Sequence, residues 1–325
     1  MRFLFVLDPL KKLDLKWDTS LTILRELNGR GHKTFAADWR DFWVEGKNVF
    51  VRAGELHPKT TPGNPESEKI HYRYIISPAR RYEVNQFDLI FLRKNPPFYP
   101  SYLHLTYVLE LASKQIPVIN HPRGIRETNE KFSILEFPRW IPETLVSSNP
   151  AQIILFQKEI KDALVIKPLD KKGGEGVFLL HKNEPANWLK LQKAMQKGKK
   201  FLIAQRFLPN TGSPGEKRIL ILDGKFAGAY EKRSAPGDFR ANLALPGSTF
   251  HPASLTKREK KLTSEVGAFL LKRGLYFAGL DVLNEKLIEI NVTSPAGICE
   301  VMSLRPKARL VQKVADFLES RAAQG

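Results

Sequence analysis

The sequence GLDVLNEKLIEINVTSP, residues 279–295, decides how the rest of this chain can be interpreted. Apolar and polar residues alternate on both sides of a central turn, which is typical of a β-hairpin. A three-residue loop would set Asp281 opposite Glu289 and Val282 opposite Ile288, because directly opposed residues in a hairpin share a face. A two-residue loop would place Asp281 opposite Ile288 and mix the two faces, which a half-buried sheet disfavours.

One face of this hairpin is expected to carry Asp281, Glu289 and Asn291. Two carboxylates and an amide are hard oxygen ligands, which Mg²⁺ or Mn²⁺ prefers when it also takes oxygens from a nucleotide phosphate. A surface hairpin with ordinary solvated acids would show the same pattern, so the hairpin alone does not decide between the two. The alternation assigns Leu280, Val282, Ile288 and Ile290 to the apolar face, and it leaves Leu283 and Leu287 on the polar one.

A second informative stretch is VIKPLDKKGGEGV, residues 165–177. A short apolar strand leads to Lys167, and a loop with Gly173, Gly174 and Gly176 follows. Glycines let backbone amides approach a phosphate closely, and a neighbouring lysine supplies a positive charge. The lysine precedes the glycines and no GK[ST] is present, so this is neither a Walker A loop nor a GxGxxG fingerprint. By itself such a loop can also be a plain turn.

Together, the lysine-bearing strand, the glycine loop and the downstream acidic hairpin resemble the ATP-grasp fold. More narrowly, the chain resembles the bacterial glutathione synthetases over nearly its whole length, in five segments that occur in the same order. It departs from them at Lys171 and Lys172, where small residues are expected, and in the span 233–240, which is one residue short. The five segments are Asp8-Pro9, Arg93 to Phe98, Asn129 to Lys131, Lys167 to Asp170, and Asn291 to Pro295.

The composition is that of a globular protein, with 325 residues, a hydrophobic fraction of 42% and a single cysteine, Cys299. One cysteine allows no disulfide within the chain, which fits a reducing cytoplasm, and we expect Cys299 to be a small buried hydrophobic residue. Residues 3–7 are too short for the apolar core of a signal peptide, and no apolar run is long enough to span a membrane. We therefore expect a cytoplasmic protein without a membrane partner.

The net charge of +18 needs an explanation. Its lysines and arginines are scattered through all segments, and no nucleic-acid recognition motif accompanies them. A solvated basic surface that attracts anionic substrates accounts for most of the charge. Nucleic-acid binding is therefore not expected, although a non-catalytic, basic nucleic-acid-binding protein stays open as an alternative of another class.

The order of predicted elements indicates an α/β protein. Alternating strands and helices predict an N-terminal, open, mostly parallel sheet domain over residues 1–121. The resemblance implies that a two-part ATP-grasp fold follows, with a small lid over residues 122–200 and a large half over residues 201–325. Residues 54–66, which are rich in proline and glycine, are expected to form a loop. We predict a continuous helix from Arg123 to Phe137.

The resemblance also implies functional roles for residues whose presence an ordinary structural role would explain equally well. Lys131 would otherwise be a solvated helix lysine, and Arg218, aligned with apolar neighbours, could simply extend its charge to solvent. Arg218, Arg240 and Asn242 are implied as catalytic, and the substrate would contact Arg93, Asn95, Arg233, Arg240, Thr293 and Ser294. The nucleotide would contact Lys131, Lys167, Gly173, Gly174, Gly176, Ile203, Ala204, Gln205, Arg206, Phe207, Leu208 and Glu216.

The implied reaction is an ATP-dependent ligation. Hydroxide is a poor leaving group, so ATP would first convert a carboxylate to an acyl phosphate that an amine can attack. By resemblance the carboxylate belongs to γ-glutamylcysteine and the amine to glycine, giving glutathione, ADP and phosphate. An ATP-grasp ligase with another amino acid or a protein tail as substrate is the main alternative. We also expect a homo-oligomer.

Overall fold

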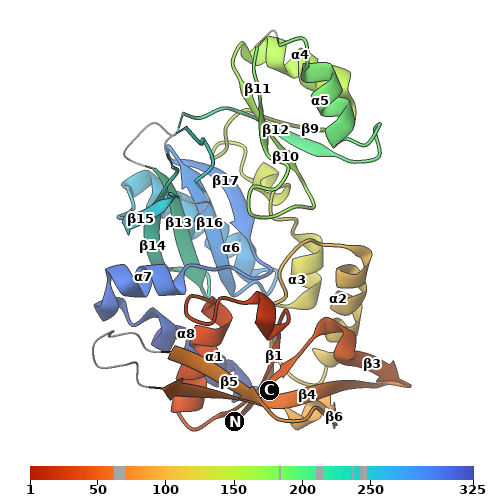
Figure 1. The fold of residues 1–325 in the computed structure, drawn as a ribbon, viewed down its shortest axis with the longest axis vertical. Coiled ribbons are helices and arrows are strands. Elements are labelled where there is room, and N and C mark those ends of the chain that lie inside the picture. The colour runs from red at the N-terminus through yellow and green to blue at the C-terminus, as the bar shows by residue number, and fades with distance from the viewer. Residues whose placement is uncertain (62–70, 183, 210–214, 236, 242, 244–246) are drawn as a thin grey trace.

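The computed structural model describes residues 1–61, 71–182, 184–209, 215–235, 237–241, 243 and 247–325. Three sheets follow one another along the molecule in Figure 1: an N-terminal sheet, a five-stranded sheet, and a four-stranded sheet at the far end. Each has helices on at least one face, as expected for an α/β protein. This arrangement confirms the predicted fold class.

The N-terminal sheet is parallel only at its centre. There β1 pairs in parallel with β2 and β7, and β7 with β8. Antiparallel strands extend one side through β4, which pairs with β2, β3, β5 and β6. The strands are β1 (Arg2–Val6), β2 (Lys33–Ala37), β3 (Phe42–Glu45), β4 (Asn48–Thr61), β5 (His71–Ile76), β6 (Arg80–Glu83), β7 (Leu89–Leu92) and β8 (Val118–Ile119).

Helices cover this sheet with apolar side chains. Asp18 caps α1 (Thr19–Gly29), whose Leu21, Ile23, Leu24 and Leu27 are fully buried. The C-terminal helix α8 (Leu310–Ala322) packs against α1, so the two ends of the chain share one apolar core. On the other side, α2 (Pro100–Ala112) packs against α3 (Pro122–Glu127).

The five-stranded sheet has the order β15-β14-β13-β16-β17, all antiparallel. One face packs against α6 (Lys257–Leu271), which begins with a capping box formed by Thr256 and Glu259. The other face carries charged side chains toward the cleft described below. Its strands are β13 (Glu216–Leu222), β14 (Lys225–Arg233), β15 (Thr249–Pro252), β16 (Phe277–Leu283) and β17 (Lys286–Asn291), and α7 (Ile298–Leu304) follows them.

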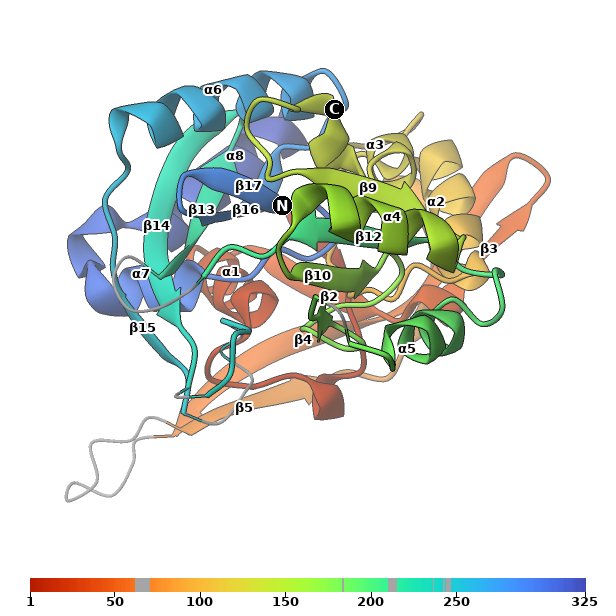
Figure 2. The same cartoon turned by 90° about the horizontal axis from the view of Figure 1, so that it is seen from above.

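The four-stranded sheet forms the lid, in the order β11-β10-β12-β9. Because side chains alternate across a strand, Leu164, Ile166, Leu202 and Ala204 face the helices α4 and α5, and Val165, Lys167 and Gln205 face the cleft. Figure 2 shows both helices on one side of this sheet. The elements are β9 (Thr144–Ser147), α4 (Pro150–Ile160), β10 (Leu164–Pro168), β11 (Phe178–Leu180), α5 (Asn187–Ala194) and β12 (Leu202–Arg206).

Three expectations need correction. Residues 54–61 continue β4, with Gly54 and Glu55 paired to β2 and residues 56–61 paired to β5, so the loop prediction fails there. Residues 62–66 lie outside the described part. The helix expected from Arg123 to Phe137 stops at Glu127, and a short 3₁₀ turn over Ser133–Glu136 follows it. The strand at 202–206 bonds to β9 and β10, so it belongs to the lid sheet. We therefore propose the same three-part division with β12 included in the lid.

A buried asparagine joins the N-terminal sheet to the acidic hairpin. Asn120 follows β8 at the carboxyl edge of that sheet. Its Nδ2 donates to the carbonyl oxygens of Phe277 and Val292 at 2.7 and 2.8 Å, and its Oδ1 accepts from the Phe277 N–H at 2.9 Å. These bonds fix the outer ends of β16 and β17, and hence the placement of the side chains between them.

Candidate active site

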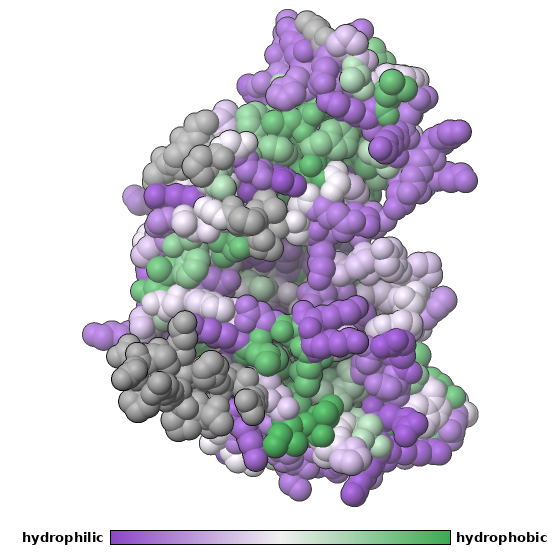
Figure 3. Space-filling view, viewed as in Figure 1, coloured by the Kyte–Doolittle hydropathy of each residue, from purple (hydrophilic) through white to green (hydrophobic). Residues whose placement is uncertain are grey.

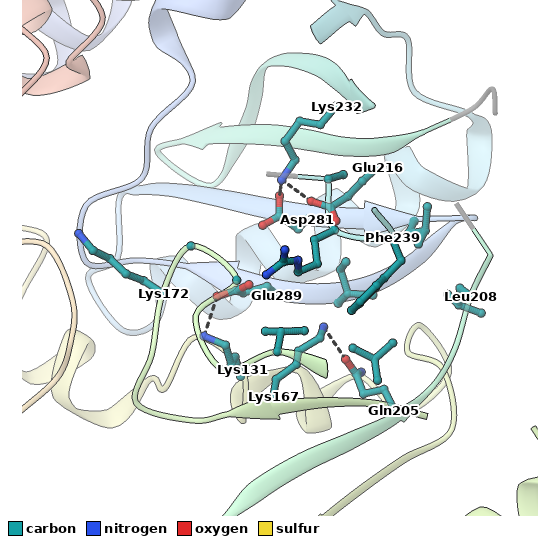
Figure 4. Close-up of a pocket in the computed structure, with 18 of the residues that line it drawn as sticks. Lys131, Lys167, Lys172, Gln205, Leu208, Glu216, Lys232, Phe239, Asp281 and Glu289 are labelled. Carbon is teal, nitrogen blue, oxygen red and sulfur yellow. Dashed lines mark hydrogen bonds and ion pairs between the residues drawn. The ribbon is translucent and has the colours of Figure 1, made fainter. Parts of the chain in front are cut away.

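A deep cleft separates the open face of the lid sheet from the charged face of the five-stranded sheet (Figure 4). Lys131, at the junction between the N-terminal part and the lid, closes one side. The lining combines cations, carboxylates and a few apolar walls. It comprises Lys131, Pro142, Val165, Lys167, Lys171 to Glu175, Val177, Gln205 to Leu208, Glu216, Arg218, Lys232, Phe239, Arg240, Ala241, Asp281, Leu283, Ile288, Glu289 and Asn291.

Asp281 is the centre of a buried ion network. Its Oδ1 accepts from the Lys232 ammonium at 2.9 Å, and its Oδ2 accepts from Arg218 Nη2 at 3.0 Å and from Asn291 Nδ2 at 3.1 Å. Burial alone would raise the pKa of Asp281, but Arg218 and Lys232 outweigh burial and lower this pKa to about 2. Lys232 also pairs with Glu216. The carboxylate is therefore ionised and held in one orientation.

Glu289 and Lys131 form the second charged contact. The ammonium of Lys131 lies 3.2 Å from Glu289 Oε1 and donates to the Lys171 carbonyl oxygen at 2.5 Å. Burial lowers the pKa of Lys131, but Glu289 and Glu130 outweigh burial and raise it. Lys131 thus joins the hairpin to the loop that follows Lys167, and its contact with a nucleotide stays a prediction.

Lys167 projects from the lid toward the same space but has only a neutral partner there. Its ammonium donates to Gln205 Oε1 at 2.9 Å (Figure 4). Burial lowers the pKa of Lys167, and the carboxylates of Glu289 and Glu216 only partly offset this effect. A half-buried cation that contacts no anion among the described residues is prepared to bind an anionic ligand.

The glycine loop follows directly. Gly173, Gly174 and Gly176 all have positive φ, at 62°, 78° and 72°, a region that other residues rarely adopt. A Cβ on Gly176 would lie 2.9 Å from Pro168 Cγ, so no larger residue fits without displacing the strand end. Gly173 and Gly174 line the cleft, where their predicted contact with a nucleotide stays a prediction. Lys171 pairs with Glu175 across the loop at 2.6 Å.

The hairpin confirms one part of the predicted register and corrects another. Asp281 pairs with Glu289, as expected, but Val282 pairs with Leu287, since a bulge interrupts the ladder after Asp281. The loop has two residues, Asn284 and Glu285, both with positive φ. The bulge therefore lets Ile288 line the cleft beside Glu289, whereas Leu287 is fully buried in the core.

The predicted nucleotide strand divides into two parts. Gln205, Arg206, Phe207 and Leu208 line the cleft, but Ile203 and Ala204 are fully buried and do not. Their backbone groups serve the lid sheet, where Ile203 pairs with Lys167 and Ala204 with Ile166. Side chains of these two residues cannot contact a ligand in the cleft.

Two of the predicted substrate residues at the carboxyl edge of the N-terminal sheet have other partners. Arg93 is 3% exposed and donates to Ser20 Oγ at 3.0 Å and to the Pro295 carbonyl oxygen at 2.8 Å. Asn95 donates through Nδ2 to Asp8 Oδ2 at 2.8 Å. Neither residue is among those that line the cleft. Both therefore position the loops around the site.

The remaining predicted residues are scattered. Thr293 Oγ1 donates to Glu130 Oε1 at 2.8 Å, and Glu130 also accepts from the N–H groups of Val292 and Thr293. Arg233 donates to Glu231 at 2.7 Å, and the half-buried Ser294 follows Thr293 outside the cleft lining. Arg240 reaches the cleft and pairs with Asp238 at 2.8 Å. Asn242 lies outside the described residues.

Several cleft residues were missed at the sequence level. Lys232 is the main one, because it connects Asp281 with Glu216. Counting back from the Asp223-Gly224 turn would place Glu231 opposite Glu216, but a bulge between Leu220 and Ile221 makes Lys232 the partner. The apolar wall formed by Pro142, Val165, Phe239, Leu283 and Ile288 was also missed, as was the network role of Glu130.

Comparison with known proteins identifies the family. The N-terminal domain of prokaryotic glutathione synthetase matches residues 1–126, and the ATP-grasp domain of the same enzymes matches residues 130–306. The chain belongs to the prokaryotic glutathione synthetase family. It is therefore an ATP-dependent, ADP-forming carbon–nitrogen ligase, as its sequence predicts.

Relatives and solved structures agree with this assignment. The chain is 37% identical to the glutathione synthetase of Nitrosomonas europaea, over 100% of this chain and 99% of the relative. It is 35% identical to that of Coxiella burnetii, over 98% and 96%. Its fold is similar to that of the D-cycloserine synthetase DcsG, with a TM-score of 0.67 and 15% identity over 97% of this chain and 99% of that one. Within the described residues no helix is long and apolar enough to cross a membrane.

Proposed function

We propose that this protein joins γ-glutamylcysteine to glycine and releases ADP and phosphate, with an acyl phosphate as intermediate. The proposal rests on one observation: a positively charged surface and a negatively charged surface line the same cleft. The lid contributes Lys167 and a glycine loop, and the hairpin contributes Asp281 and Glu289. A triphosphate needs the first surface, and the divalent ions that accompany it need the second.

The reaction requires the carboxylate oxygen of the peptide to attack the γ-phosphate of ATP. ADP leaves with the bridging oxygen, and the glycine amine then displaces phosphate from the acyl carbon. Lys131 and Lys167 bind the phosphates of ATP, and Arg218 balances charge that develops on the transferred group. Gln205 to Leu208 and the apolar wall hold the adenine, and Glu216 contacts the ribose.

The hairpin residues fit a divalent ion. Asp281 is ionised, and Asn291 uses Nδ2 for its bonds to Asp281 and the Gly279 carbonyl oxygen, so its Oδ1 remains available as a ligand. The described residues hold no cluster of three or more His, Cys, Asp or Glu side chains that could bind a metal. A site here thus consists of Asp281, Glu289 and Asn291 together with phosphate oxygens. Mg²⁺ or Mn²⁺ held there would offset the negative charge of the phosphates.

Substrate contacts follow from the position of the loops. Arg240 reaches the cleft, so it binds an anionic part of the peptide or of the acyl phosphate. Arg233, Asn242 and Ser294 are assigned to the substrate by family resemblance alone. Arg93, Asn95 and Thr293 lie outside the lining of this cleft, and their contacts with the substrate are likewise proposed from the family resemblance alone. A cytoplasmic location and a homo-oligomer are part of the same proposal.

The test measures ADP release by the purified protein with ATP and Mg²⁺. We expect release only when γ-glutamylcysteine and glycine are both present, with glutathione formed in equal amount. If another amino acid replaces glycine with higher kcat/KM, the alternative ATP-grasp ligase is correct and the glutathione proposal is wrong. If no acid and amine pair supports ADP release, the ligase assignment itself fails.

A further inference from the structure

The lid has a second cavity on the face turned away from the cleft. It has a volume of about 400 Å³ and lies between α4 and α5, which lie side by side at the far end of the molecule in Figure 1. This size is within the range of small-ligand sites. Figure 3 shows hydrophilic side chains over much of this end. The lining residues are Ile154, Gln157, Lys158, Lys161, Lys182, Glu184, Pro185, Asn187 and Trp188.

Three lysines surround the cavity. Lys158 and Lys161 come from the carboxyl end of α4, and Lys182 follows β11. All three side chains are exposed, and none has an ion-pair or hydrogen-bond partner in the part of the chain that the structure describes. Glu184 is the acidic residue among the described lining residues, and its Oε1 accepts from Lys190 at 2.5 Å. The rim is therefore attractive to an anion.

Buried acceptors point to a ligand with hydrogen-bond donors. Asn187 is 4% exposed, and its Nδ2 donates to the His181 carbonyl oxygen at 2.7 Å and to Gln157 Oε1 at 3.4 Å. These two bonds fix the orientation of the amide, and its Oδ1 has no partner among the described residues. Glu184 Oε2 is likewise buried, without a partner in the described part of the chain. Buried acceptors are rarely left without a donor, because each unmade bond costs the desolvation of that group.

The third feature is a flat apolar wall. Trp188 is 44% exposed although it is a large aromatic residue and lies at the start of α5, next to Asn187. An indole in this position can stack on a planar ring. A nucleotide requires three kinds of contact, and the cavity offers all of them. The cations at the rim suit its phosphates, the buried acceptors suit its base N–H groups, and the aromatic wall suits stacking of its base.

We propose that this cavity is a second nucleotide site that binds a purine nucleotide on the outer face of the lid. The base stacks on Trp188, and its N–H groups donate to Asn187 Oδ1 and Glu184 Oε2. The phosphates contact Lys158, Lys161 and Lys182. The site is separate from the cleft, since Leu164 and Ile166 fill the space between α4 and β10 while Lys167 faces the other way. It therefore does not depend on the proposed ligase reaction.

Equilibrium dialysis with radiolabelled ADP tests the stoichiometry. We expect about two ADP per wild-type chain, and about one per chain when Lys158→Ala and Trp188→Ala are combined, because losing the stack and one cation weakens that site by about tenfold or more. The matched control combines Leu189→Ala and Lys193→Ala, two exposed residues of α5 that do not line the cavity, and should still bind about two. Unchanged ligase turnover in both double variants shows that they fold.

A measurement on the unmodified protein completes the test. Acetylation of surface lysines, followed by mass spectrometry, should show that ADP protects Lys158, Lys161 and Lys182 but leaves Lys193 reactive. One ADP per wild-type chain, or no protection of the three lysines, would overturn the proposal. Protection by an oligoribonucleotide but not by ADP would also overturn it, because the lid would then bind a polymer rather than a nucleotide.

Discussion

Both walls of the cleft carry charged side chains, but Asp281 on one wall is paired with opposite charges, whereas Lys167 on the other contacts a neutral amide. On the five-stranded sheet, Asp281 contacts Arg218 and Lys232 within 3.0 Å, and Glu289 lies 3.2 Å from Lys131. On the lid, Lys167 contacts only the neutral amide of Gln205. The sheet wall is complete without a ligand, whereas the lid wall lacks the anion that its cation would pair with. We infer that the sheet wall supplies rigidity and that the lid wall supplies affinity for phosphate.

Glu289→Gln should have the largest effect on the reaction. The substitution keeps the shape of the side chain but removes a charge next to the proposed metal ions. We expect kcat to fall about a thousandfold, or roughly 4 kcal/mol of transition-state stabilisation, while the KM for the peptide changes far less. Steady-state kinetics with each substrate varied in turn would measure this.

Glu285→Gln is a matched control, because Glu285 lies in the turn of the same hairpin and pairs with Arg258 and Thr256 at the surface. It should leave turnover unchanged. Near wild-type turnover in Glu289→Gln would falsify the placement of the metal site on this hairpin.

The contrast with the sequence-level prediction follows from the bulges. Alternation alone correctly placed Asp281 opposite Glu289, because a mixed face would have been unfavourable. It did not place Ile288 in the cleft or pair Lys232 with Glu216, because each hairpin contains one extra residue that shifts the register. A bulge depends on local backbone geometry that residue patterns do not report. Family resemblance pointed to Lys131 and Lys167, which line the cleft, and their nucleotide contacts stay a prediction; it could not show that Arg93 and Thr293 are engaged by neighbours.

The second prediction concerns the stability of the sheet wall. Asp281→Asn would leave Arg218 without a carboxylate partner in a buried position, and Lys232 would keep only Glu216. We expect the free energy of unfolding to fall by about 3 kcal/mol, as when one partner of a buried ion pair is removed. Urea denaturation followed by circular dichroism would measure it. Asp316→Asn is the control, because Asp316 pairs with Arg30 at the surface and its side chain is 66% exposed. This substitution should change the free energy of unfolding by less than about 1 kcal/mol.

The pH dependence sharpens this second prediction. The folded pKa of Asp281 is lowered to about 2, from an ordinary value of about 4. Its ionised form therefore stabilises the fold above pH ~4, and this contribution is lost as the pH falls toward 2. The wild type should lose stability more steeply than Asp281→Asn across this window. Parallel curves for the two proteins would mean that Asp281 is not held by Arg218 and Lys232.

The third prediction compares the buried Lys217 with the half-buried Lys167 under the same substitution. Lys217 pairs with Glu259 at 2.8 Å, whereas Lys167 contacts only Gln205. Lys217→Met strands a buried carboxylate and should lower the unfolding free energy by about 3 kcal/mol. Lys167→Met removes a desolvated cation and should leave the stability unchanged or higher, but it should raise the KM for ATP by about a hundredfold. Equal loss of stability in both variants would show that Lys167 is not the unpaired cation of the lid.

The smallest effect is expected in the loop over residues 170–177, where the two walls meet. Three glycines at positive φ and the largely exposed Glu175 leave this loop with few contacts of its own. Its backbone amides should therefore exchange with solvent quickly without nucleotide, and several-fold more slowly when ATP and Mg²⁺ are bound, because ordering the loop removes the open states from which exchange occurs. Hydrogen–deuterium exchange with mass spectrometry can follow the loop beside β10, whose residues 164–166 are paired on both sides and should exchange slowly in either state. In Lys167→Met the protection by ATP should weaken while the exchange of the free loop stays the same, because this substitution removes the phosphate contact and not the glycines. Equal exchange of the loop with and without ATP in the wild type would mean that the lid wall does not respond to phosphate, and the difference between the two walls would then be one of charge pairing alone.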